Sequence, residues 1–180
     1  DHMHASGINF HIPHSFNPRA PYDTDCPPYF YNGGFEPRWP LYRVYADYTS
    51  RLSVMLSGGR HVCPVALLFL GHSAQVGKFV PPEQMSEALQ DALFDCDWLP
   101  YDVFEQDATL SDKAVALRQE AYHVLIVPPV EVIPYGTLEK AKRFFDAGGV
   151  VVGYGFLPTK SATLGRDSKD VAAVRAAIWG

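Results

Sequence analysis

The first clear pattern in the chain is a short alternation of apolar and polar residues, which predicts a strand near the amino terminus. This strand would run over Ile8–Ile12, with its apolar side chains on one face and the polar pair Asn9 and His11 on the other. The polar row makes Asn9 and His11 the first candidates for contact with a ligand.

A longer segment, Pro40–Ser57, has the 3.6-residue spacing of an amphipathic helix. Pro40 suits the first helical turn, and Gly58 and Gly59 would end the helix. The residues between the strand and the helix lack periodicity and are rich in Pro and aromatic side chains. The apolar stripe of the helix consists of Leu41, Val44, Tyr45, Tyr48, Leu52, Met55 and Leu56.

One strand and one helix cannot bury their own apolar surface, so we expect the first third of the chain to be the end of a larger domain. In a (β/α)₈ barrel, the apolar side of each strand packs on the outer helices. The inner side can be polar near the carboxyl-end rim, where active sites lie. Because a helix follows the strand, we interpret residues 1–59 as the terminal strand, aromatic loop and helix of a TIM-type barrel.

From His61 onward, strands rich in Val, Leu and Ile alternate with helices. This pattern predicts a parallel sheet covered on both faces, an α/β domain of the flavodoxin-like, three-layer kind over residues 60–180 with about four strands. We expect Val62–Leu70, His123–Val127 and Val150–Tyr154 at the centre of the sheet. The other predicted elements are helix Pro82–Phe94, strand Tyr101–Glu105, helix Ser111–Ala121, helix Leu138–Ala147 and a last helix that Asp167 or Ser168 caps and that reaches Trp179.

Composition and charge exclude several classes of partner. The net charge of −5 and the absence of a basic block argue against nucleic acid or an anionic membrane surface. The longest apolar stretch, Val62–Leu70, is far shorter than the roughly 20 residues of a membrane span. The three cysteines show no CxxC spacing, so neither a zinc site nor a disulfide framework is predicted. We expect no metal and no cofactor.

Several stretches resemble parts of known glycoside hydrolases. Ala121–Pro129 and Leu138–Val152 resemble the class I glutamine-amidotransferase-like domain that follows the catalytic barrel in enzymes such as the family-42 β-galactosidases, where it helps to form the trimer. The upstream stretches Gly7–His14, Cys26–Tyr31 and Tyr48–Ser57, together with the pair Trp39-Pro40, are similar to the end of the barrel in the family-106 α-L-rhamnosidases. The resemblance implies that the parent protein hydrolyses polysaccharide, in the periplasm or outside the cell.

The same comparison implies that the catalytic residues are not in this chain. Retaining and inverting glycosidases both need a pair of carboxylates at a defined separation. The predicted strand carries no Asp or Glu, and in such barrels the carboxylates come from earlier strands. We therefore expect the chain alone to be inactive and to contribute contacts with the substrate.

Side chains that suit a sugar surround the predicted barrel rim. Imidazole and amide groups both donate and accept hydrogen bonds, as polyols require, and an aromatic ring can stack on the apolar face of a pyranose. The alternative is that the polar groups only line the barrel and the aromatic groups seal its mouth. The expected substrate-binding residues are Asn9, His11, His14, Tyr29, Tyr31 and Trp39.

A second candidate site lies at the carboxyl edge of the predicted parallel sheet. Gly71, His72, Pro128 and Tyr154 would meet there, where α/β domains bind small molecules. Class I amidotransferases carry a nucleophilic cysteine at a sharp turn after one strand, and Tyr154 stands at or beside that place. Glutaminase activity is therefore not expected, and a domain for packing and oligomerisation is favoured over a small-molecule site.

The sequence thus supports two functions from different classes. The first is a part of an α-L-rhamnosidase-like glycoside hydrolase that contacts a carbohydrate substrate and forms an interface. The alternative is a non-catalytic carbohydrate-binding or oligomerisation module. Both include a carbohydrate or a second copy of the chain as partner, and neither includes nucleic acid or membrane.

Overall fold

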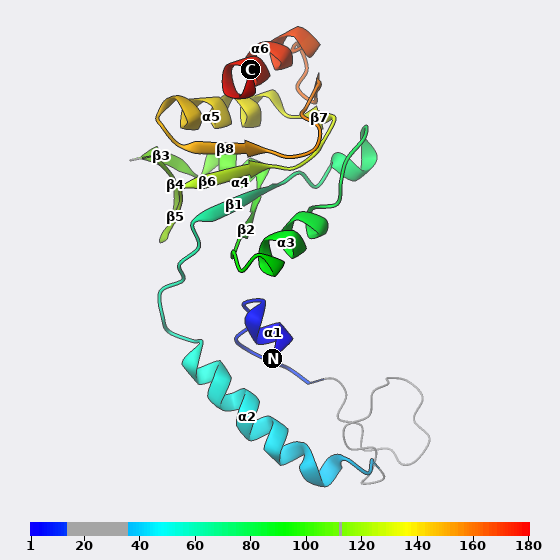
Figure 1. Ribbon diagram of the computed structural model, residues 1–180, viewed down its shortest axis with the longest axis vertical. Coiled ribbons are helices and arrows are strands. Elements are labelled where there is room, and N and C mark those ends of the chain that lie inside the picture. The colour runs from blue at the N-terminus through cyan, green and yellow to red at the C-terminus, as the bar shows by residue number, and fades with distance from the viewer. Residues whose placement is uncertain (14–35, 112) are drawn as a thin grey trace. The chain divides into compact units, whose positions relative to one another are not determined.

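The computed structural model describes residues 1–13, 36–111 and 113–180. The chain divides into two compact units, Asp1–Arg60 and His61–Gly180, here called unit 1 and unit 2. Figure 1 shows the elements of both. No helix within the described ranges is long and apolar enough to cross a membrane.

The described residues of unit 1 include two α-helices. A short helix α1 (His2–Ala5) ends at Gly7, whose φ of +88° turns the chain in a conformation that favours glycine. A 3₁₀ turn η2 (Trp39–Leu41) leads into α2 (Tyr42–Met55), which confirms the helix predicted from the apolar stripe.

The strand predicted over Ile8–Ile12 is wrong. These residues have no regular secondary structure, and Ile8, Phe10 and Ile12 are exposed. A strand needs a neighbour for its backbone N–H and C=O groups, and none of the described segments pairs with this one. The alternation is present in the sequence, but an alternating pattern alone does not make a ladder.

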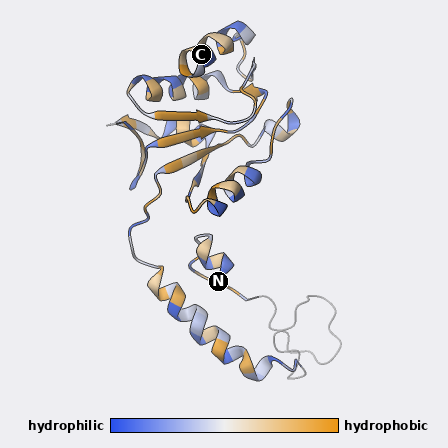
Figure 2. Ribbon diagram, viewed as in Figure 1, coloured by the Kyte–Doolittle hydropathy of each residue, from blue (hydrophilic) through white to orange (hydrophobic). Residues whose placement is uncertain are grey.

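Most of the apolar stripe of α2 is exposed in the described part of the chain. None of the residues of α2 is buried, and Val44 and Met55 remain 69% and 79% exposed. Figure 2 shows hydrophobic and hydrophilic residues distributed along the whole of α2, in contrast to the mainly hydrophobic strands β1 (Val65–Phe69), β6 (Val124–Val127) and β8 (Val150–Gly153) of unit 2.

Unit 2 is built on a four-stranded sheet in the order β2-β1-β6-β8, with every neighbouring pair parallel. The strands are β1 (Val65–Phe69), β2 (Asp97–Pro100), β6 (Val124–Val127) and β8 (Val150–Gly153). The predicted parallel sheet is therefore confirmed. One detail differs, because the strand predicted over Val150–Tyr154 lies at the edge of the sheet rather than at its centre.

Helices cover both faces of this sheet, as predicted (Figure 1). Helix α3 (Pro82–Asp91) packs through Met85 on a small cluster that includes Leu67 and Ile126. The opposite face carries the larger core, to which α4 (Tyr101–Gln106), α5 (Tyr135–Asp146) and α6 (Ser168–Trp179) contribute buried residues. Alternate residues of the two central strands, β1 and β6, enter these two cores, as the period of two requires.

The cap predicted for the last helix is present. The Asp167 carboxylate accepts hydrogen bonds from the backbone N–H groups of Lys169 (2.8 Å) and Asp170 (3.1 Å). The Asp170 carboxylate accepts in return from the Asp167 N–H, which completes a capping box.

Two predicted elements have the wrong type. Residues 101–105 form α4 instead of a strand, because Pro100 caps the helix and the sheet position beside β1 is taken by β2. Residues 111–121 form antiparallel strands instead of a helix, namely β3 (Thr109–Ser111), β4 (Ala114–Leu117) and β5 (Glu120–Tyr122). Lys113 and Arg118 have positive φ at the two turns, and Val115 of β4 is completely buried.

The remaining elements lie in connections of unit 2. A 3₁₀ turn η3 (Ser73–Gln75) follows β1, and the two-residue strands β7 (Val132–Ile133) and β9 (Lys160–Ser161) pair in parallel.

Candidate functional site

A pocket of about 450 Å³ in unit 1 brings together residues that are far apart in the sequence. One side comes from the segment after α1 and the other from the carboxyl-terminal half of α2. The residues that line it are Asn9, Phe10, His11, Thr49, Ser50, Ser53, Val54 and Ser57.

Local contacts hold α1 and the segment after it together, and one contact joins the start of the chain to α2. The His4 ring donates through Nδ1–H to the carbonyl of Ile8 (2.9 Å), and it stacks on the His11 ring with 4.2 Å between centroids. The Tyr48 hydroxyl of α2 donates to the carboxylate of Asp1. These contacts fix the place of His11 although no strand forms.

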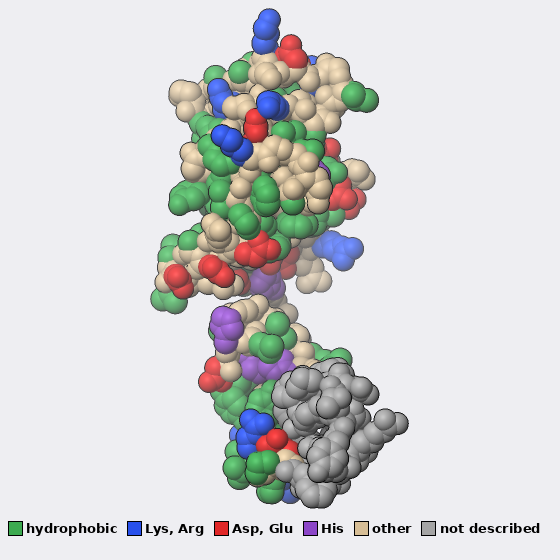
Figure 3. Space-filling view, turned by 90° about the vertical axis from the view of Figure 1, so that its right-hand side faces the viewer, with side chains coloured by type: hydrophobic (Ala, Val, Ile, Leu, Met, Phe, Trp, Pro, Cys, Tyr) green, Lys and Arg blue, Asp and Glu red, His purple; other side chains and the backbone are tan. Residues whose placement is uncertain are grey.

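The pocket combines polar groups with apolar surface. Both ring nitrogens of His11 are buried and have no hydrogen-bond partner among the described residues. A buried polar group without a partner costs about 1–3 kcal/mol, so this imidazole suits a ligand that both donates and accepts. Phe10 and Val54 supply the apolar part of the lining. Figure 3 shows histidine side chains beside hydrophobic ones at the surface of unit 1.

The hydroxyl residues on α2 were not among the predicted site residues. Thr49, Ser53 and Ser57 follow each other at intervals of four, the spacing that puts side chains on one face of a helix. The Thr49 and Ser57 hydroxyls donate to helix carbonyls, which leaves their oxygen lone pairs as acceptors. In the sequence, their only signal is their place on the polar face of the predicted helix.

Of the four other predicted substrate-binding residues, the structure describes only Trp39. Trp39 is not part of the pocket lining and stacks on Tyr42 with 5.3 Å between ring centroids. His14, Tyr29 and Tyr31 lie outside the described residues.

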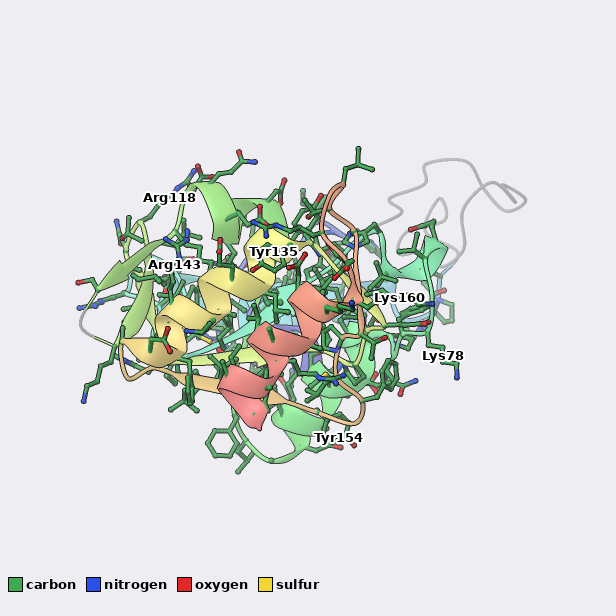
Figure 4. The ribbon with its side chains drawn as sticks, turned by 90° about the horizontal axis from the view of Figure 1, so that it is seen from above. Lys78, Arg118, Tyr135, Arg143, Tyr154 and Lys160 are labelled. Atoms are coloured by element: carbon green, nitrogen blue, oxygen red, sulfur yellow. The ribbon has the colours of Figure 1, made fainter. Side chains whose placement is uncertain are left out.

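In unit 2, His72 and Tyr154 both follow strands of the parallel sheet, and their surroundings differ. His72 is half-buried and meets the edge of the Tyr101 ring, with centroids 5.4 Å apart. Burial lowers the pKa of His72, and its Nε2 has no partner within the described part of the chain. Tyr154 is exposed beyond the end of β8 (Figure 4). No hydrogen bond or ring contact joins the two side chains in the described ranges.

Beyond the carboxyl ends of β1 and β6, hydrogen bonds and an ion pair join the connecting segments of unit 2 to one another. The Glu131 carboxylate accepts from the Lys78 backbone N–H (2.9 Å) and pairs with Lys160 Nζ (2.7 Å), and the hydrogen bond from Lys160 lowers the Glu131 pKa. The Val80 N–H donates to the Pro129 carbonyl (2.9 Å). Lys78 and Lys160 lie on the same side of unit 2 in Figure 4. The loop after β1 is thereby fixed to the loop after β6.

Comparison with known proteins now places this geometry in context. The sequence model of the α-L-rhamnosidase family, glycoside hydrolase family 106, matches residues 1–180. No curated protein matches the sequence.

Two solved structures are similar to parts of the chain. The rhamnosidase from Novosphingobium sp. PP1Y is similar with a TM-score of 0.53 and 20% identity, over 78% of this chain and 13% of that one. The β-galactosidase from Bifidobacterium adolescentis has a TM-score of 0.40 and 20% identity, over 57% of this chain and 44% of that one. The chain therefore spans a small part of the rhamnosidase and less than half of the β-galactosidase.

Proposed function

The chain belongs to the α-L-rhamnosidase family of glycoside hydrolases, family 106, and from this premise we propose that it is part of an enzyme that hydrolyses glycosidic bonds in a polysaccharide. In this proposal, unit 1 contacts the sugar and unit 2 provides an interface. The catalytic carboxylates are not among the residues assigned to the sugar contact.

The observation that carries the proposal is the polar pocket of unit 1. Sugar hydroxyls need groups that donate and accept, and Asn9, His11 and the serines of α2 offer both. The pyranose ring also has an apolar face, which the Phe10 ring suits. Asn9 and His11 are thus proposed as substrate-binding residues, with His14, Tyr29, Tyr31 and Trp39 as further candidates from the sequence.

The lining of this pocket supports binding rather than catalysis. None of its described lining residues is an Asp or a Glu. Since glycoside hydrolysis requires one carboxyl group as acid and a second as nucleophile or base, the pocket cannot perform the reaction with its own side chains.

Family membership also suggests which domain each part of the chain belongs to. We assign residues 1–59 to a (β/α)₈ barrel whose other elements cover the apolar stripe of α2, and residues 60–180 to an amidotransferase-like, flavodoxin-like domain. The strand order β2-β1-β6-β8 and the position of Tyr154 directly after β8 support this assignment. A tyrosine at that position supplies no thiolate, so the domain would have no glutaminase activity.

A second candidate function is favoured by one observation, the exposed stripe on α2. A helix face with side chains such as Leu41, Val44 and Met55 in water is typical of a surface that packs against another element or chain. The chain could then serve as a non-catalytic carbohydrate-binding or oligomerisation module.

Titration calorimetry with L-rhamnose tests the proposed sugar contact. The wild-type chain should bind weakly but saturably, and His11→Ala should weaken binding about tenfold, the equivalent of roughly 1.4 kcal/mol for a lost buried hydrogen bond. Asn9→Ala should act in the same direction.

His2→Ala is the matched control, because His2 is exposed and does not line the pocket. It should bind like the wild type. If L-rhamnose gives no heat with the folded wild-type chain, or if His2→Ala loses as much affinity as His11→Ala, the proposed site is wrong.

A further inference from the structure

A histidine at the start of unit 2 is surrounded by three carboxylates. His61 Nδ1 lies 3.7 Å from Asp97 Oδ2 and 3.5 Å from Glu120 Oε2, and its Nε2 lies 3.4 Å from Asp95 Oδ2. These separations are longer than ordinary N–H···O hydrogen bonds, which are about 2.7–3.2 Å. The group shares no residue with the pocket lining of unit 1 and does not include His72, and the proposed function does not use it.

Each member of this group is held by the fold. The Pro64 carbonyl accepts from the backbone N–H groups of His123 (2.8 Å) and Val124 (3.0 Å), which fixes the segment that carries His61. Asp97 is the first residue of β2, and Glu120 is the first residue of β5. The three side chains thus come from separate segments and converge through the sheet topology.

The spacing of the three donor atoms suits a single cation. One nitrogen of His61 and one oxygen each of Asp97 and Glu120 lie within 4.8 Å of one another. Two ligand atoms that each lie about 2.1 Å from one ion, at tetrahedral or octahedral angles, are separated by roughly 3.0–3.4 Å. The His61 separations need a shift of only a few tenths of an ångström to reach this geometry.

The surroundings of these atoms are those of metal ligands. Asp95 faces Nε2, the ring nitrogen that a ligating histidine uses to donate to an outer carboxylate, so that Nδ1 is free to bind the ion. The Tyr122 hydroxyl, on a side chain only 4% exposed, donates to Asp97 Oδ2 (2.9 Å). This bond holds the Asp97 carboxylate in place beside His61.

We propose that His61 Nδ1, Asp97 Oδ2 and Glu120 Oε2 bind one divalent transition-metal ion, with Zn²⁺ as the best match. A mixed set of imidazole and carboxylate donors suits Zn²⁺ better than Mg²⁺ or Ca²⁺, which prefer oxygen alone. The two ligating carboxylates balance the charge of the ion. The bound ion would join the segment before β1 to β2 and β5, and thereby stabilise unit 2.

Calorimetric titration of the full chain with ZnCl₂ tests the proposal. The wild type should bind one Zn²⁺ per chain, His61→Ala should lose at least about a hundredfold in affinity, and Asp95→Ala should lose about tenfold through its effect on the ring. Glu120→Gln should also bind more weakly. Without zinc, the melting temperatures of the wild type and His61→Ala should be similar, whereas zinc should raise the melting temperature of the wild type and leave that of His61→Ala unchanged.

Two controls separate this site from general binding by surface groups. His123→Ala removes an exposed histidine and Asp91→Ala an exposed carboxylate of the same unit, and neither should change the affinity. The proposal is overturned if folded wild-type chain gives no zinc-binding heat, if His61→Ala binds as the wild type does, or if the controls lose as much as the ligand variants. In each of those cases the group is an ion-pair network of His61 with its carboxylates.

Discussion

Two half-buried histidines, His11 in unit 1 and His72 in unit 2, keep ring nitrogens without a partner among the described residues. They differ in what surrounds them. His11 lines a pocket with hydroxyl and amide groups. His72 lies in the loop after β1, where it meets the edge of the Tyr101 ring. The first arrangement suits a polyol ligand and the second a neutral imidazole in an apolar contact.

The lowered pKa of His72 predicts a dependence of stability on pH. Burial disfavours the imidazolium form of His72 in the folded state. Below the ordinary pKa of histidine, near 6.5, His72 therefore binds a proton more readily in the unfolded chain than in the folded chain. The contribution of His72 to the free energy of unfolding is therefore fully present above that value and declines as the pH falls below it. His72→Gln should lose less stability between pH 7.5 and 5.5 than the wild type does.

Urea unfolding at the two pH values, followed by circular dichroism, measures this difference. Gln90→Ala, an exposed change in α3, should follow the wild type. Equal losses for the wild type and His72→Gln would show that His72 does not carry the effect.

At the scale of elements, the sequence predicted the parallel sheet and most helices because their patterns are long and their ends are marked. The Val-rich segments of β6 and β8 and the capping box at Asp167 are such signals. Ala114–Leu117 is too short for its period to be decided, and its pairing with neighbouring strands makes it β4. Ile8–Ile12 has a clean alternation but no partner strand among the described residues, so the local pattern predicted a strand that does not form.

The tight turn between α5 and β8 gives a prediction at this scale. A Cβ added to Gly149 would lie 2.2 Å from the ring of Phe144, which is completely buried. Gly149→Ala should therefore lower the free energy of unfolding by about 2 kcal/mol or more, because the core must move to admit the methyl group.

Gly71→Ala is the matched control within unit 2, since its added Cβ meets the Phe69 ring at an ordinary contact distance of 3.4 Å. Chemical denaturation should show a change of less than about 0.5 kcal/mol for this variant. A Gly149→Ala protein as stable as the Gly71→Ala protein would contradict the packing described for α5 and β8.

For the whole molecule, the division near residue 60 and the α/β nature of unit 2 follow from a change in pattern that is visible in the sequence. The pocket of unit 1 was predicted only in part, through Asn9 and His11. Its α2 residues, and the convergence of His61, Asp97 and Glu120, depend on contacts between distant segments that no local spacing records.

The exposed stripe of α2 predicts that the chain associates with itself. All members of the stripe except Leu52 are exposed, and six such side chains at roughly 1.5 kcal/mol each would contribute up to about 9 kcal/mol if another surface buried them. Size-exclusion chromatography with light scattering should show a concentration-dependent oligomer. Val44→Asp and Met55→Asp should shift it toward monomer, because a carboxylate on the stripe opposes its burial.

Arg51→Asp places the same charge on α2 outside the stripe and should leave the association unchanged. A wild-type chain that stays monomeric over the whole concentration range, or an Arg51→Asp chain that dissociates as the stripe variants do, would contradict this role for α2.

The central claim is that unit 1 contacts sugar through the polar pocket, and the histidine ring resonances of the chain test it most directly. In a titration with L-rhamnose followed by NMR, the account predicts saturable shifts of the His11 ring signals, with the signals of His2 unchanged. Saturable binding that leaves His11 unmoved, or no binding by the folded chain, would contradict the account.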